Sequence, residues 1–453
     1  MPDNTNQDAN RTQSLNDAQK THMLGADLRT QMIPPVMPEK GLELSVIPGR
    51  ECILANAPSR EQILLEIRGT GGAGLGARPF LNVVLVIDRS GSMEGEPLDY
   101  VKRACSYVVD LLAPNDILSV VTFAETAEVL IPPRRIVNKD LIKQHIQRIV
   151  PGNTTNLYDG LALGAQQILS AREPGRVERL IVFTDGEPTT GIKDYNSLVQ
   201  HVGEIKNQGI TSTFLGFGYE YNEELLAGMA KRAGGNYYFI SKPELIPEIF
   251  RAELDKLFTL AGRNLRLRLK TARWVVLRQI FGHSIPYGQR EIELNLADVE
   301  KENSLEVVLD LEFQNHPLGI YRVLTGRLIY DDAVTGKEES VDFDVILEFS
   351  ADAERCNVPQ NPRVAGAVEI ARVSRAVEKT IMGLKRGEVT AAMAVAELQK
   401  TQMLLLQEGR TAEAQQVHQA IRDLQGGKAK EVEKTLTGTI ITLDQGKKQN
   451  KTE

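Results

Sequence analysis

The sequence is poor in the residues that bind transition metals or form disulfide frameworks. It has three cysteines, Cys52, Cys105 and Cys356, which lie far apart and include no CxxC pair. Its six histidines are scattered, without HxxxH or similar spacing. We therefore expect reduced cysteines, as in a cytosolic protein, and neither a disulfide framework nor a zinc site.

Long apolar runs and a strong net charge are also missing. The sequence has no run of about 18 apolar residues and no basic start followed by an apolar segment, so we expect a cytoplasmic protein that does not span a membrane. The net charge of -7 gives no reason to expect nucleic acid or an anionic membrane as a partner. The basic stretch RNLRLRLKTAR at 263–273 alternates with leucine, which is typical of the solvated face of a strand.

What is present is the composition of a soluble globular protein, with 42% hydrophobic and 25% charged residues. A length of 453 residues favours two or three domains. Residues 1–39 are polar and then proline-rich, which predicts a disordered tail. Strands are expected within 40–80, where the glycine-rich stretch at 69–79 lacks the Lys-Ser/Thr of a P-loop and is interpreted as a joint between domains.

Residues 81–260 alternate continuous apolar runs with amphipathic helical stretches. This alternation indicates a parallel sheet covered by helices on both faces, which is an open, doubly wound, Rossmann-like α/β domain. The strands are predicted at 82–88, 117–124, 179–185 and 211–218.

Residues 261–350 show an apolar period of two, which predicts antiparallel strands. Such strands need a second layer to bury their apolar sides, and the strands within 40–80 are candidates for part of it. We therefore expect a β-sandwich that flanks the α/β domain or receives it as an insertion. Residues 351–453 predict a helical hairpin plus one more helix, then a strand at 435–443 and a polar tail.

The stretch LNVVLVIDRSGSMEG at 81–95 passes from a buried strand directly into an acid and two hydroxyls. Asp88 is the last residue of the predicted strand, and Ser90 and Ser92 follow it. In an open parallel sheet, ligands bind outside the carboxyl ends of the strands. These three side chains are therefore candidates for a binding site.

Two further segments reach the same edge of the predicted sheet. Asp185 ends another strand in IVFTDGEP, and the loop PGNTTNLYDG at 151–160 places Thr154 and Thr155 just before a helix. Every candidate group is a hard oxygen donor, and none is a cysteine or histidine. Such a set suits a hydrated Mg²⁺ or Mn²⁺ ion, which prefers oxygen ligands and retains water.

The same residues resemble a family signature. DRSGS at 88–92 is similar to the DxSxS motif of von Willebrand factor A (VWA) domains, Thr155 matches their threonine, and TDGEP supplies their later aspartate at Asp185. Together these motifs resemble a complete metal-ion-dependent adhesion site (MIDAS) within residues 81–260. The resemblance implies that Mg²⁺ or Mn²⁺ is held and that an Asp or Glu of a partner protein fills its open position. The implied ligands are Asp88, Ser90, Ser92, Thr155 and Asp185.

The flanking segments extend the resemblance. A VWA domain between β-rich segments is similar to the arrangement in integrin β chains and inter-alpha-trypsin-inhibitor heavy chains, and bacterial cytosolic proteins share it. The resemblance implies a bacterial, intracellular scaffold or adaptor. Its implied partners are proteins, including AAA ATPases or other multi-protein assemblies.

Two other interpretations remain open. Asp88 with Mg²⁺ is also a candidate nucleophile for a phosphotransferase or hydrolase of the haloacid-dehalogenase type, although Ser90 stands where that family has its acid–base aspartate. Alternatively, Asp88 and the serines only cap the helix that begins near Pro97. We expect protein binding without enzymatic activity.

Overall fold

The computed structural model describes residues 40–70, 79–185, 187–217, 222–240 and 246–448. The tail predicted at 1–39 and most of the glycine-rich stretch at 69–79 lie outside these residues. None of the described helices is long and apolar enough to cross a bilayer.

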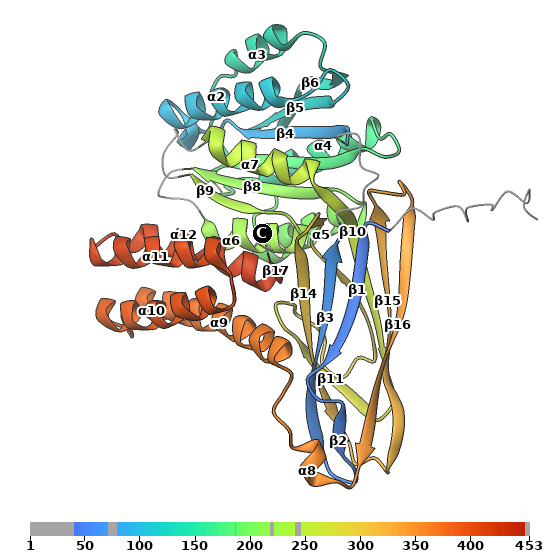
Figure 1. The fold of residues 1–453 in the computed structure, drawn as a ribbon. Helices are drawn as coiled ribbons and strands as arrows, with labels where there is room; N and C mark the ends of the chain where they lie inside the picture. Colours follow the sequence, from blue (N-terminus) through green and yellow to red (C-terminus); the bar gives the residue numbers. More distant parts are fainter. Residues whose placement is uncertain (1–39, 71–78, 186, 218–221, 241–245, 449–453) are drawn as a thin grey trace, which may run out of the picture. The chain divides into compact units, whose positions relative to one another are not determined.

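The α/β segment contains a six-stranded sheet among the described residues (Figure 1), in the order β6-β5-β4-β7-β8-β9. The neighbours run parallel, except for the antiparallel pair β5 and β6. The four predicted parallel strands are confirmed. The edge strand β6 was missed because it is mostly exposed and contains two prolines. The strands are β4 (Leu81–Asp88), β5 (Ile117–Phe123), β6 (Ala127–Arg135), β7 (Val177–Thr184), β8 (Thr211–Phe217) and β9 (Tyr237–Ile240).

Helices cover both faces of this sheet, and the fully buried strand β4 shows why. Val83 and Leu85 belong to one apolar cluster with α2, α3 and α7, whereas Val84 and Val86 belong to another with α4, α5 and α6. Alternate side chains of one strand therefore supply both cores. Four of these helices begin at an Asn or Asp that caps the first turn. The elements are η1 (Gly91–Met93), α2 (Glu96–Leu111), α3 (Lys139–Gln147), α4 (Leu157–Ser170), α5 (Tyr195–Asn207), α6 (Glu223–Ala233) and α7 (Ile246–Phe258).

Two further sheets, built from segments on both sides of the α/β segment, share one apolar core. Strand β3 pairs with β14 from Ser59 to Arg68, so the chain returns to the same sheet after the α/β segment. The first sheet contains β1 (Leu42–Pro48), β3 (Ser59–Gly69), β11 (Val275–Ile280), β14 (Ser304–Phe313) and β17 (Lys447–Lys448). The second contains β2 (Cys52–Leu54), β10 (Leu260–Thr271), β12 (Glu291–Asn295), β13 (Val299–Glu300), β15 (Gly319–Asp332) and β16 (Glu338–Ser350).

The basic stretch at 263–273 lies mostly in β10 and has the predicted solvated face. Its leucines are buried in the core that the two sheets share. Arg268 and Lys270 form ion pairs with glutamates of the neighbouring strand β12, and Arg266 forms one with Glu338 of β16, two strands away. The cluster of positive charge is therefore neutralised within the sheet and forms no free basic patch.

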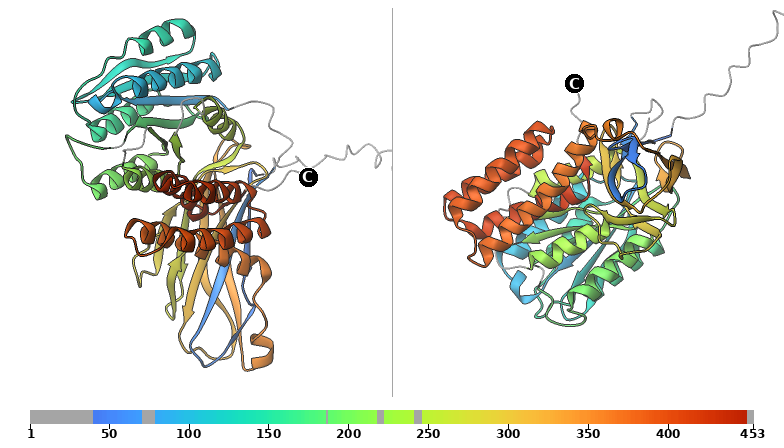
Figure 2. Two further views of the ribbon diagram at one scale, coloured as in Figure 1. Left: turned by 90° about the vertical axis from the view of Figure 1, so that its left-hand side faces the viewer. Right: turned by 90° about the horizontal axis from the view of Figure 1, so that it is seen from below.

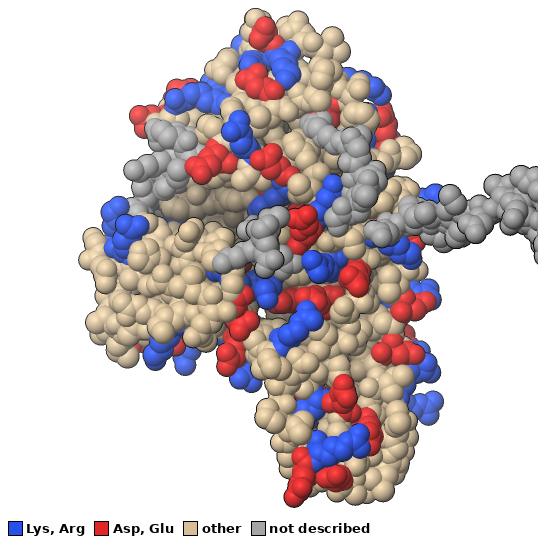
Figure 3. Space-filling model, viewed as in Figure 1, with Lys and Arg blue, Asp and Glu red and all other residues tan. Residues whose placement is uncertain are grey.

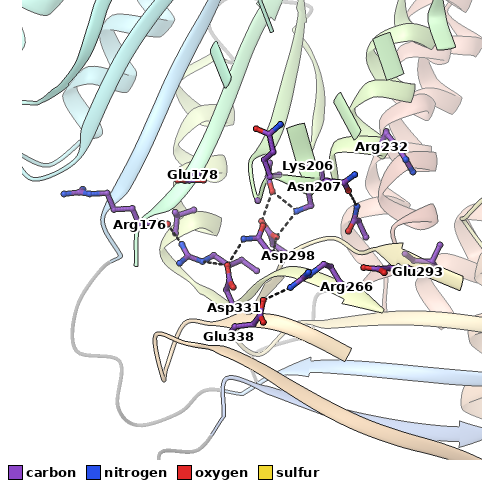
Figure 4. A pocket seen from close by; sticks show the side chains of 18 of the residues that line it. Arg176, Glu178, Lys206, Asn207, Arg232, Arg266, Glu293, Asp298, Asp331 and Glu338 are labelled. Atoms are coloured by element: carbon purple, nitrogen blue, oxygen red, sulfur yellow. Dashed lines mark hydrogen bonds and ion pairs between the residues drawn. The ribbon is translucent and has the colours of Figure 1, made fainter. Parts of the chain in front are cut away.

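A buried ionic cluster centred on Asp298 joins the α/β segment to these sheets (Figure 4). The Asp298 carboxylate accepts hydrogen bonds from Arg179 at 3.2 Å and from Lys206 at 3.5 Å. It also accepts one from the Asn264 amide at 3.2 Å. Burial would raise the pKa of Asp298, but Lys206 and Arg179 outweigh it and hold the pKa well below its usual range. The cluster lies beside a cavity of about 1180 Å³ whose charged lining residues are mostly ion-paired.

The C-terminal helices pack side by side (Figure 2), and they correct one prediction. The strand expected at 435–443 is wrong, because these residues form the second half of α12. Their threonines and isoleucines favour a strand, but Leu436 and Leu443 pack in the helical core while Ile441 joins a core of the α/β segment. Tertiary packing outweighs the local preference. The helices are α8 (Ala353–Cys356), α9 (Pro362–Lys385), α10 (Ala391–Gln407), α11 (Thr411–Gln425) and α12 (Ala429–Asp444).

The expectation of three reduced cysteines is also wrong. Cys52 of β2 and Cys356 of α8 form a disulfide, with their Cα atoms 4.8 Å apart. They are 304 positions apart in the sequence, and only the pairing of β2 with β16 brings them together. Cys105 is free and buried. Because disulfides are typical of oxidising compartments, the cysteine count no longer supports a reducing cytosol.

We expect this disulfide to contribute measurably to stability, because a crosslink restricts the unfolded chain. Cys356→Ser should lower the melting temperature by several degrees in scanning calorimetry. A reductant should lower the melting temperature of the wild type but leave that of the variant unchanged. Thiol titration of the denatured, unreduced protein should find one free thiol, and finding three would contradict the crosslink.

Candidate metal centre

Asp88 lies completely buried at the carboxyl end of β4. Its Oδ1 atom accepts a hydrogen bond from the backbone amide of Ser90 at 2.8 Å. Its Oδ2 atom accepts one from the hydroxyl of Thr184, the last residue of β7, at 2.6 Å. The carboxylate is therefore fixed between two adjacent strands of the sheet.

The serine loop lies between this carboxylate and that of Asp185. The hydroxyl groups of Ser90 and Ser92 are 3.2 Å apart. Ser92 also donates a hydrogen bond to the Asp185 carboxylate. Ser90 is buried, whereas Ser92 is exposed. Four of the five predicted side chains are thus joined directly to one another.

Thr155 joins this group through the backbone of its loop. Its amide donates a hydrogen bond to the Thr189 hydroxyl at 2.8 Å, which ties the loop to the segment after β7. Two residues earlier, the Asn153 carbonyl accepts a hydrogen bond from Gly91 in the serine loop at 3.2 Å. Both Thr154 and Thr155 are candidate ligands from the sequence. Thr155 is buried and Thr154 only partly buried, which favours Thr155 as the ligand.

Burial disfavours the charged forms of the two carboxylates. Burial, and then repulsion by Asp185, raises the pKa of Asp88 to about 7. Burial also raises the pKa of Asp185. The Oδ1 atom of Asp185 is buried without a hydrogen-bond partner among the described residues. One buried and one partly buried acid beside serine hydroxyls fit a divalent cation with hard oxygen ligands.

The helix-capping interpretation is not supported. Ser90 precedes the short helix η1, but its side chain makes no capping hydrogen bond. Helix α2 starts after Gly95, which has no side chain to cap it. The hydroxyls of Ser90 and Ser92 remain available to a ligand.

Two residues that support the site were missed in the sequence. Thr184 orients Asp88, and its position just before Asp185 at a strand end is a signal that could have been used. Glu125 accepts a hydrogen bond from the Asn153 amide at 2.8 Å and so holds the threonine loop. Glu125 belongs to no sequence motif, and only the folded chain brings it next to Asn153. Glu187 is exposed, and the sequence did not include it among the ligands.

A family model for the von Willebrand factor type A domain matches residues 82–252. The chain is 30% identical over 306 residues to the uncharacterized protein sll0103 of Synechocystis, a match that covers 65% of this chain and 72% of that protein. It is 29% identical over 162 residues to inter-alpha-trypsin inhibitor heavy chain H4 of Bos taurus, covering 34% of this chain and 18% of that protein.

Solved structures resemble most of the chain. A von Willebrand factor type A protein from Catenulispora acidiphila aligns with a TM-score of 0.66 and 18% identity, covering 83% of this chain and 89% of that one. The ArnB paralog VWA2 from Sulfolobus acidocaldarius aligns with a TM-score of 0.62 and 18% identity, covering 88% of this chain and 99% of that one. At this identity the likeness shows the fold alone.

We expect the affinity for Mg²⁺ to fall as the pH drops below about 7, because Mg²⁺ must then displace a proton from Asp88. Isothermal titration calorimetry should show that the dissociation constant for Mg²⁺ rises by up to about tenfold for each pH unit below that pKa. Above that pKa the dissociation constant should change little. Asp88→Asn should abolish most of the affinity. Asp140→Asn, at an exposed position of α3, is the matched control. An affinity that does not depend on pH would contradict the assignment of Asp88.

The same pKa sets the sign of the effect on stability. Folding raises the pKa of Asp88 from 3.8 to about 7, so the folded state holds a proton on Asp88 more tightly than the unfolded state does. In the absence of metal, the free energy of unfolding is therefore highest at low pH and falls as the pH rises from 3.8 to about 7. The metal-free protein should therefore lose stability across this window, and added Mg²⁺ should restore it most strongly at the upper end. Melting curves with Mg²⁺ and with EDTA measure both effects.

Proposed function

This chain belongs to the family of von Willebrand factor type A domain proteins, and we propose that it binds a partner protein through a Mg²⁺ ion at the carboxyl ends of β4 and β7. The observation that supports the proposal is the pair of acids, Asp88 completely buried and Asp185 partly buried, with the Ser90 and Ser92 hydroxyls beside them. Mn²⁺ is the alternative ion for the same donors.

The donor set supports capture of an acidic side chain. Two carboxylates and three hydroxyls bring less negative charge than a cage of carboxylates, so a bound Mg²⁺ would accept a further anionic oxygen. Asp88 and Asp185 would hold the ion, directly or through water, while Ser90, Ser92 and Thr155 supply neutral oxygens. The exposed position of Ser92 indicates the side from which an Asp or Glu of the partner would approach.

One charged contact is too small for a specific complex. Stable interfaces bury roughly 1,200–2,000 Å² in total, so the loops around the site must also contact the partner. Asn153 and Glu187 are exposed on two of these loops. We propose a scaffold or adaptor role, with a multi-protein assembly such as a AAA ATPase complex as one class of partner.

We propose binding without catalysis. A phosphotransferase of the haloacid-dehalogenase type would need an acid–base aspartate two positions after Asp88 for proton transfer. Ser90 occupies that place. The cytoplasmic location expected from the sequence depended on reduced cysteines, whereas the Cys52–Cys356 disulfide favours an oxidising compartment.

We expect partner capture to depend on both the metal and the buried acid. Immobilised wild-type protein should retain a protein from native lysate in Mg²⁺ and release it in EDTA. Asp88→Ala and Ser90→Ala should not retain it in either condition. Ser170→Ala, at an exposed serine of α4, should behave as wild type.

Binding of the purified partner then shows whether the metal site or another surface holds it. Replacement of the partner's contacting Asp or Glu by Asn or Gln should weaken binding about as much as EDTA does. Retention of the same proteins by every variant and in EDTA would show that the metal site is not the binding surface.

A further inference from the structure

Helix α10 exposes an apolar face to solvent. Met393, Met403 and Leu406 are 60%, 63% and 51% exposed, Ala392 and Ala396 are exposed as well, and the polar residues exposed with them are Gln399, Lys400 and Gln407. These residues lie mainly on the side of the helix opposite to its buried positions. Solvent-exposed apolar residues that follow one helix face are typical of a docking surface, and methionine suits such contacts. The buried positions are Ala394, Leu398, Thr401 and Leu405.

The charge pattern of this face fits a second copy of the chain. Glu397 and Lys400 are the only charged residues of α10, and their side chains form an ion pair at 3.3 Å. The face is therefore neutral and does not repel an identical face. Charged side chains of the helical group lie mainly along its borders in Figure 3, with uncharged surface between them. The small side chains of Ala392 and Ala396 allow close approach of another helix.

We propose that α10 of one copy packs antiparallel against α10 of a second copy, around a two-fold axis close to Gln399. An isologous contact requires a surface that is complementary to itself. With the axis between the levels of Leu398 and Gln399, Glu397 of one copy lies opposite Lys400 of the other. Met393 then lies within about one residue of the position opposite Met403, so both the charges and the large apolar side chains come close to their counterparts.

The contact between two α10 helices is small. A helix of 17 residues is about 25 Å long. Two such faces bury on the order of 1,000 Å² in total, near the lower limit for a specific interface. We therefore expect a weak, reversible dimer that forms in the micromolar range.

Sedimentation velocity of the full chain tests the proposal. The wild type should shift from monomer to dimer as its concentration rises through the micromolar range. Ala396→Glu should raise the dimer dissociation constant at least about tenfold, because it buries two like charges near the axis. Ala252→Glu, at an exposed alanine of α7, adds the same charge elsewhere and should dimerise as wild type. Melting curves establish that both variants fold.

Charge exchange and crosslinking test the antiparallel register. Lys400→Glu should weaken the dimer, and the double variant Glu397→Lys with Lys400→Glu should restore it. Under mild oxidation, Gln399→Cys should form a covalent dimer because the two thiols meet at the axis, whereas Ala391→Cys should not. A wild type that stays monomeric, as expected if another protein occupies this face, would overturn the proposal. Dimers unaffected by Ala396→Glu would do the same.

Discussion

The burial of the Asp88 carboxylate, with the partly buried carboxylate of Asp185 beside it, is the constraint on which the site depends. A fully buried central strand ends at Asp88, so the fold places an acid where water cannot solvate its charge. The neighbouring strand β7 leads into the second acid, and the hydroxyls of Ser90 and Thr184 offset only part of the cost. The divalent cation that we propose here would neutralise both acids at once. The hydroxyls of the neighbouring loops would then supply its remaining ligands.

The sequence could bring the residues of this candidate site together because its signals are local. A continuous apolar run that ends in Asp88 indicates a buried parallel strand, and the carboxyl ends of such strands meet at one edge. The motif around Ser90 and the aspartate at 185 could therefore be brought together without coordinates. The support from Glu125 could not, because this residue acts on a loop about thirty positions later in the chain and no pattern marks it.

The two clear errors arose where distant contacts outweighed local signals. The segment at 435–443 has the β-branched residues of a strand, yet Leu436 and Leu443 face the helical core at a helical spacing. Cys52 and Cys356 became partners only because a short strand before the α/β segment pairs with one after it. Both contacts join residues that lie too far apart in the sequence for a local pattern to reveal them.

The fold also connects the metal site to the rest of the chain through one strand. Arg179, near the start of β7, binds the interdomain acid Asp298, and Thr184, at its end, orients Asp88. Both ends of this buried strand are thus fixed by polar contacts, which gives the site a rigid base. A rigid site on each copy of an α10-linked dimer would present two metal-bridged contacts together. The effective concentration of the second contact would then raise the avidity for a partner with repeated acidic groups, even though each single charged contact is weak.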